Sequence, residues 1–241
     1  MEHTLKITNV LSDPTRFYIY QYITNCHRDV TVQEIADKFS IHPNVARLHL
    51  SKLEDVRMLY AETKKTGRGG RPSKLYRLSA EVIQLSFPFR NYQLLSSILL
   101  QSLEKLGPEG SKALYETGYS FGKEMMGQEL HRLSSSIEEL SNKDKIQLLK
   151  HAAILAGLKP ELEWDEEESS IYFEVFNCPF KETAKLNKDK VCMMHQQFFI
   201  GMFEAVFPDV HLSERQNMLS GCQQCAYKAH ICEPSHIMNL K

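Results

Sequence analysis

The sequence predicts an α+β protein with an N-terminal domain of helices and two strands, further helices in the middle of the chain, and an antiparallel sheet with helices at its C-terminal end. Two observations lead to this prediction, and a third concerns the chemistry of the C-terminal end. Apolar residues recur at helical spacing up to about residue 55 and again between residues 91 and 156. Runs that alternate apolar and polar residues follow after residue 160. Five of the six cysteines lie beyond residue 175, so this end of the chain needs a chemical explanation.

The composition is that of an ordinary globular chain with an uneven charge distribution. It has 241 residues, 42% of them hydrophobic, which suffices for two modest cores. We find no apolar run of membrane-spanning length and no signal-peptide pattern, so we expect a cytoplasmic protein without a membrane partner. The net charge is −1, yet residues 40–80 hold nine Lys and Arg against three acids, whereas residues 161–174 hold seven acids and no base. The basic segment suits a polyanion.

The first 55 residues contain start signals for short helices. Thr31 followed by Glu34 is a capping-box pattern, and Pro43 starts another helix after a three-residue turn at residues 40–42. This last helix is expected to bury Ala46, Leu50 and Leu53. Two helices joined by so short a turn, the second with polar and basic residues on its free side, predict a helix-turn-helix motif.

Two strands are expected next, at residues 58–63 and 74–78. The segment 67–72 between them is rich in glycine and arginine, which predicts a wing that can approach a sugar-phosphate surface. Residues 1–84 are therefore expected to form a winged helix-turn-helix domain that binds double-stranded operator DNA. The expected contacts are Asn44 and Arg47 to bases, Ser51 and Lys52 near the backbone, and Arg68 and Arg71 from the wing.

The middle of the chain, residues 85–135, is expected to be a helical linker and dimerisation region. Two helices are predicted there, at residues 91–106 and 110–133. Their apolar faces either pair with a second copy of the chain or cover their own domain. We favour a homodimer, because a winged regulator normally binds a two-fold symmetric site.

Residues 136–241 are expected to form a cysteine-rich, cofactor-sensing domain. Its predicted elements, in chain order, are a helix to about residue 156, a hairpin of strands at 161–164 and 171–176, a helix from about 189 to 207, and closing strands at 211–219 and 225–231. Ligands from such separate segments converge where strand and helix ends meet at one edge of a sheet.

Four cysteines, Cys178, Cys192, Cys222 and Cys225, lie on such segments. In a reducing cytosol clustered thiols are typical of metal sites or redox switches. We expect Cys192 in the first turn of its helix, where the helix dipole favours the thiolate, with His195 on the same face. Two kinds of site stay open: a structural zinc with four ligands, or a labile iron–sulfur cluster.

Motifs in both halves resemble a known family. Asp13-Pro14-Thr15-Arg16, the run from Pro43 to Leu50 and the run from Gly69 to Leu78 resemble ArsR-type winged-helix regulators. Within that group the chain is most similar to the SufR-like iron–sulfur cluster-sensing repressors, whose three-cysteine pattern Cys178, Cys192 and Cys225 resemble in order and approximate spacing. The resemblance implies a homodimeric repressor in which these cysteines hold a [4Fe-4S] cluster that sets operator affinity. His195 and Cys222 are the candidates for the fourth ligand.

We therefore expect a DNA-binding transcription regulator that senses redox state, oxygen or cluster status. The alternative is a winged-helix regulator with a structural zinc or a ligand-sensing C-terminal domain. A thiol-disulfide oxidoreductase built on Cys222 and Cys225 is less expected, because the strand-to-helix setting of thioredoxin-like enzymes is missing. We also find no nucleophile, base and orienting group in sequence, and no phosphate loop, so we do not expect an enzyme.

Overall fold

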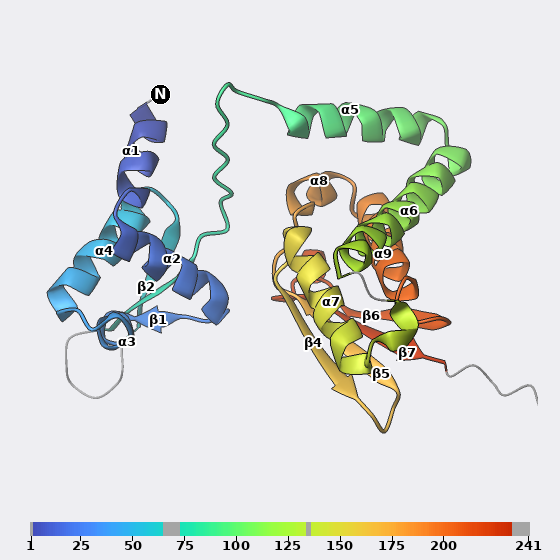
Figure 1. Cartoon of the computed structure of the whole chain (residues 1–241). Coiled ribbons are helices and arrows are strands. Elements are labelled where there is room, and N and C mark those ends of the chain that lie inside the picture. The colour runs from blue at the N-terminus through green and yellow to red at the C-terminus, as the bar shows by residue number, and fades with distance from the viewer. Residues whose placement is uncertain (1, 65–72, 134–135, 233–241) are drawn as a thin grey trace, which may run out of the picture. The chain divides into compact units, whose positions relative to one another are not determined.

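The chain forms two compact units, Met1–Arg90 and Asn91–Lys241, in a computed structural model that describes residues 2–64, 73–133 and 136–232. Figure 1 shows helices and a small sheet in the first unit, and helices packed on a larger sheet in the second. The prediction of an α+β chain with antiparallel sheets is confirmed. None of the described helices combines the length and the apolar character needed to cross a bilayer.

Within residues 2–64 and 73–90, the first unit forms four helices and a three-stranded antiparallel sheet. Its elements are α1 (Glu2–Leu11), α2 (Pro14–Cys26), β1 (Val30–Thr31), α3 (Val32–Phe39), α4 (Pro43–Asp55), β2 (Leu59–Lys64) and β3 (Ser73–Leu78), with the strands in the order β1-β3-β2. The core is apolar, and its innermost side chains include Ile19, Ile35, Leu50, Leu53 and Tyr76. The expected wing tip at residues 67–72, with Arg68 and Arg71, lies outside the described residues.

Local hydrogen bonds fix where these helices begin. The Thr31 hydroxyl accepts from the backbone N–H of Glu34 at 3.1 Å, as its N-cap position predicts. The Glu34 carboxylate, however, accepts from Arg28 and Tyr22, so it is not the second half of a capping box. After α4, Arg57 adopts a left-handed φ of 60°, a conformation in which glycine is the usual residue.

The second unit includes the helical region predicted for residues 85–135 from residue 91 onward. Its elements are α5 (Tyr92–Lys105), α6 (Pro108–Leu133), η1 (Ile137–Glu139), α7 (Asn142–Leu155), β4 (Pro160–Asp165), β5 (Ser170–Val175), α8 (Lys181–Leu186), α9 (Lys188–Glu204), β6 (Val210–Gln216), η2 (Met218–Ser220) and β7 (Cys225–Ile231). The sheet is antiparallel with the order β4-β5-β7-β6. Its apolar face packs against helices through edge-to-face rings, with Phe173 4.9 Å from Phe199 between centroids.

Helices α6 and α9 contact each other backbone to backbone. A Cβ atom at Gly122 of α6 would lie 2.0 Å from the carbonyl oxygen of Phe198, and one at Gly201 of α9 would lie 2.1 Å from the carbonyl oxygen of Tyr119. No other residue type fits at either position without moving a helix. The contact holds α9 firmly against the long helix α6.

Candidate functional site

The candidate site lies at the end of the second sheet where three cysteines come together. Val175, the last residue of β5, is the register partner of Cys225, the first residue of β7. Because the two strands are antiparallel, the loop that leaves β5 and carries Cys178 starts beside Cys225. Cys192 comes from α9. All three thiols are free and partly buried, and Cys225 and Cys192 lie near enough to Cys178 for their negative charge to raise its pKa.

The turn η2 supplies hydrogen-bond donors to two of these sulfur atoms. The side-chain amide of Asn217 lies with Nδ2 3.8 Å from Cys192 Sγ and 3.0 Å from the Glu214 carboxylate. The backbone N–H of Met218 donates to Cys225 Sγ at 3.4 Å. The Asn217 side-chain oxygen accepts from the backbone N–H of Leu219 at 2.8 Å, which fixes the direction in which the amide points. Donors aimed at sulfur favour its anionic form.

His195 is the most enclosed polar side chain of the site. Its Nδ1 lies 3.7 Å from Cys178 Sγ, and its ring packs against Phe180 and Phe199 with centroid distances of 4.9 and 4.2 Å. Burial among these rings lowers the pKa of His195 to about 3, so the imidazole is neutral at physiological pH. Its other nitrogen, Nε2, is buried and has no hydrogen-bond partner among the described residues. A neutral imidazole is the form that binds metals.

Burial dominates the protonation of the thiols. It raises the pKa of Cys178 to about 11, and negative charge on Cys225 or Cys192 would raise it further. Burial likewise raises the pKa of Cys225. It also raises the pKa of the Tyr227 hydroxyl, two residues further along β7, and negative charge on any of the three thiols raises that pKa further. In this state the sulfur atoms are protonated and weak nucleophiles, and a metal ion that binds them must displace protons.

The expectation that a helix dipole activates Cys192 is wrong. Helix α9 begins at Lys188, so Cys192 lies in its second turn, where the dipole has fallen off. The pKa of Cys192 is raised, with burial as the largest cause, and the hydrogen bond from Asn217 lowers it only in part.

The donor set suits soft metals, but it is not closed around a single ion. Three thiols and a neutral imidazole are donors that zinc and iron–sulfur clusters take. Within residues 2–64, 73–133 and 136–232, however, no three His, Cys, Asp or Glu side chains are placed to hold one metal ion. Cys222 is exposed in the turn before β7, and Cys232 is exposed beyond it. A centre of several metal atoms bridges wider gaps between thiols than one zinc ion does.

The predicted DNA-contacting residues of α4 share one face of that helix. Asn44, Arg47 and Lys52 are exposed and Ser51 is partly exposed. The Arg47 guanidinium donates to the Asn44 side-chain oxygen at 2.9 Å, which orients both side chains. The opposite face is buried, as predicted for Ala46, Leu50 and Leu53.

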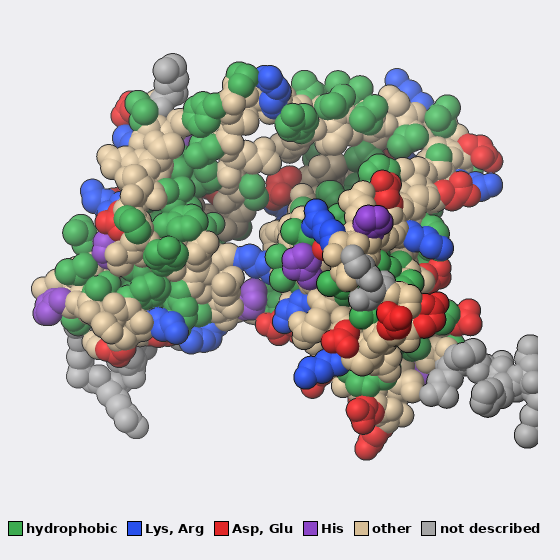
Figure 2. Space-filling view, viewed as in Figure 1, with side chains coloured by type: hydrophobic (Ala, Val, Ile, Leu, Met, Phe, Trp, Pro, Cys, Tyr) green, Lys and Arg blue, Asp and Glu red, His purple; other side chains and the backbone are tan. Residues whose placement is uncertain are grey.

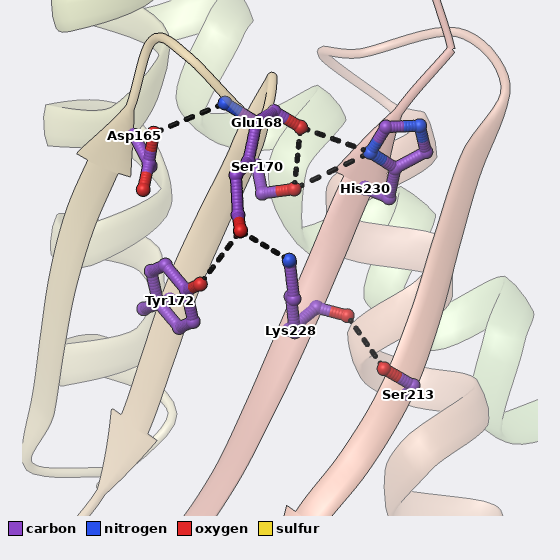
Figure 3. A network of polar contacts seen from close by, with 7 residues as sticks. All are labelled: Asp165, Glu168, Ser170, Tyr172, Ser213, Lys228 and His230. Atoms are coloured by element: carbon purple, nitrogen blue, oxygen red, sulfur yellow. Dashed lines mark hydrogen bonds and ion pairs between the residues drawn. The ribbon is translucent and has the colours of Figure 1, made fainter.

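A polar network on the other face of the second sheet brings a serine and a histidine together (Figure 3). Ser170 Oγ lies 3.3 Å from His230 Nδ1, but the hydroxyl also donates to the carbonyl oxygen of Glu168 at 2.8 Å, and Ser170 is fully buried. The Glu168 carboxylate accepts from Tyr172 at 2.7 Å and from Lys228. These contacts tie the turn between β4 and β5 to β7, and they keep the Ser170 hydroxyl buried and hydrogen-bonded.

Two residues of the site, Asn217 and Tyr227, are not foreseen from the sequence. Tyr227 could have been found, because the alternation of a strand places it on the same face as Cys225. Asn217 carries no comparable signal, since its position depends on how the turn η2 folds back toward α9.

Comparison with known proteins gives one family, and two of the structural likenesses follow it here. The sequence model described as "Methanogen output domain 1" matches residues 95–230. A trafficking protein particle complex subunit 3 from Naegleria fowleri, covalently bound to palmitic acid, is 16% identical with a TM-score of 0.42, over 58% of this chain and 97% of that one. The phenol-responsive sensory domain of the transcription activator PoxR with phenol is 15% identical with a TM-score of 0.43, over 77% and 89%. No curated protein matches the chain.

Proposed function

Because this chain belongs to the methanogen output domain 1 family, whose model matches residues 95–230, we propose that its second unit carries a signal to a DNA-binding first unit. The signal is the chemical state of the site formed by Cys178, Cys192 and Cys225. The chain would then be a transcription regulator whose operator affinity follows that state, and it would act as a homodimer.

The convergence of the three thiols is the observation that carries this proposal. They come from a loop, a helix and a strand, and negative charge on Cys192 or Cys225 raises the pKa of Cys178. Buried, protonated thiols resist oxidants, which disfavours a simple peroxide-sensing cysteine. They bind a soft metal centre at the cost of proton release, so occupancy would change both charge and packing in this region.

An iron–sulfur cluster is the cofactor that we favour for this site. Cys178, Cys192 and Cys225 would be its ligands, and the orphaned nitrogen of His195 or the exposed thiol of Cys222 would supply the fourth. When bound, a cluster supplies sensitivity to oxygen and redox state. The donors from Asn217 and Met218 would offset the negative charge of the ligating sulfur atoms.

The DNA-binding half of the proposal rests on α3, the short turn and α4. The exposed face of α4 presents Asn44 and Arg47, already oriented by their mutual hydrogen bond. Arg side chains commonly read guanine and Asn side chains adenine in the major groove. Within the winged helix-turn-helix interpretation, Ser51 and Lys52 would lie near phosphates, and Arg68 and Arg71 would contact DNA from the wing.

The test begins with anaerobic purification of the full chain, followed by a visible spectrum and iron, sulfide and zinc analysis. A gel shift on the DNA upstream of the chain's own coding sequence, with loaded and stripped protein, then measures operator affinity at several salt concentrations. We expect a brown protein whose affinity differs between the two forms by at least about tenfold, or about 1.4 kcal/mol.

Single Cys→Ser changes separate the ligands from the bystanders. Changes at Cys178, Cys192 or Cys225 should abolish the spectrum and the difference in affinity, whereas Cys26→Ser in the other unit is the matched control and should retain both. A colourless protein with one zinc per chain would show that the site holds a structural zinc and not a cluster. No shift of any DNA with either form would refute the regulator.

A further inference from the structure

Helix α5 has a broad apolar face that none of the described residues of its own unit covers. Not one of its residues is buried. Six large apolar side chains on α5 and its C-cap residue are each more than half exposed, namely Tyr92, Leu94, Leu95, Ile98, Leu99 and Leu106. Figure 2 shows hydrophobic side chains gathered along this helix. At about 100° per residue, the six fall within an arc of roughly 160°.

The opposite side of α5 faces its own unit and is held there. Ser96, Ser97, Leu100 and Leu103 are the partly buried residues of the helix. The Lys190 ammonium of α9 donates to the Glu104 carboxylate at 2.9 Å and anchors the C-terminal turn. The apolar arc is therefore the side of α5 that is turned away from the rest of its own unit.

The area of this surface matches one half of a protein interface. Six such side chains, each exposed by half or more, leave on the order of 600 Å² of apolar surface, at the upper end of what a monomer exposes. A stable complex uses about 800 Å² from each partner. No charged residue occurs between Tyr92 and Leu103, so the middle of the helix can be desolvated without burying a charge.

We propose that the apolar face of α5 binds the same face of α5 in a second copy of the chain, antiparallel, with the two-fold axis at Leu99. An isologous contact requires a self-complementary surface. Tyr92 and Leu106 lie seven residues before and after Leu99, two turns away on the same side, so each would pack on the other across the axis. Leu95 would fit beside the small Ser102, and the charged last turns would stay at the solvent-exposed ends.

The pairing deepens the function proposed above and rests on it in one respect. A two-fold pair of chains presents two α4 helices to a two-fold operator, which is how helix-turn-helix dimers bind. The apolar face of α5 belongs to the second unit, so association can be measured without DNA.

The experiment uses light scattering and sedimentation velocity on the full chain at low micromolar concentration. Wild type should be a dimer. Leu99→Glu and Leu99→Lys should each be monomeric, because each brings two like charges together at the axis, and the dissociation constant should rise by roughly 100-fold or more. An equimolar mixture of the two variants should restore the dimer. Leu155→Glu on α7, equally exposed, is the matched control and should stay dimeric.

Far-UV circular dichroism and the fluorescence of Trp164 check that each variant folds. A monomeric wild type overturns the proposal. In that case the apolar face either binds lipid vesicles or covers the chain's own first unit. A lower melting temperature of Leu99→Glu would indicate the second of these. Failure of the mixed variants to pair overturns the two-fold geometry. If wild type is a dimer but shifts no DNA, the proposed regulator function is refuted and the α5 pairing stands. If wild type is a monomer that shifts DNA, the α5 pairing is refuted and DNA binding stands.

Discussion

Replacing Gly122 by alanine is expected to destabilise the second unit, even though alanine is the better helix former. The added Cβ would lie 2.0 Å from the Phe198 carbonyl oxygen, and such atoms stay at least 3.0 Å apart in proteins. Helices α6 and α9 must therefore separate by about 1 Å. Both atoms in this clash belong to rigid helices, so no rotamer change relieves it.

The cost follows from the side chains that bridge the two helices. A gap of 0.5–1 Å removes about a quarter to a half of the dispersion attraction between facing atoms. Met126, Phe198 and Met202 are buried around the contact, and a buried side chain of this size is worth about 2–3 kcal/mol. For these three side chains together the loss is about 2–4 kcal/mol, and the helix propensity of alanine returns about 1 kcal/mol, which leaves about 1–3 kcal/mol.

Gly127→Ala is the matched control, because it lies on the same helix and its added Cβ meets nothing within 4 Å. This variant should be more stable than wild type by about 1 kcal/mol. The assay is urea unfolding followed by the fluorescence of Trp164, the one tryptophan of the chain, which stacks on Phe207 in this unit. Equal stability of the two variants would refute the backbone contact.

Three further predictions concern the first unit. Arg57→Gly should stabilise it by about 0.5 kcal/mol, since glycine adopts the left-handed φ of 60° without strain, and a thermal melt showing a lower midpoint would contradict this. Burial lowers the pKa of His49, so below a pH of about 6.5 the unfolded chain binds a proton that the folded chain refuses. Stability should be complete above that pH and fall below it, and His49→Leu should lose the pH dependence; an imidazole that titrates above 6.5 by NMR would show the sign to be wrong. If the chain binds DNA as proposed, Arg47→Ala should weaken specific binding by about 1–3 kcal/mol in a gel shift, and an unchanged affinity would remove Arg47 from the interface.

The starts of the helices could be predicted because they depend on neighbours in the chain. Asp13 and Thr31 each accept a hydrogen bond from a backbone N–H three residues later, which is a pattern readable in four letters. The capping-box prediction for Glu34, which rests on the same pattern, is wrong. Its carboxylate has a better partner in the Arg28 guanidinium, which also holds the pKa of Glu34 below its usual value.

The contact between α6 and α9 could not be predicted in this way. Gly122 and Gly201 are far apart in the chain, and a glycine inside a helix looks like a weak point until a second backbone lies against it. The thiol site falls between these cases. The order of Cys178, Cys192 and Cys225 along strands and a helix indicated that they converge, but the donor from Asn217 and the burial that keeps the thiols protonated depend on tertiary packing.

The contact between α6 and α9 also bears on which elements would be displaced when a ligand binds the sulfur atom of Cys192. Cys192 and His195 are on α9, and a few residues along the same helix its main chain touches the main chain of α6 directly. No rotatable group lies at that touching point to absorb a displacement. We therefore expect a ligand that draws Cys192 toward Cys225 to displace α6 together with α9, and with α6 the turn that leads into α5.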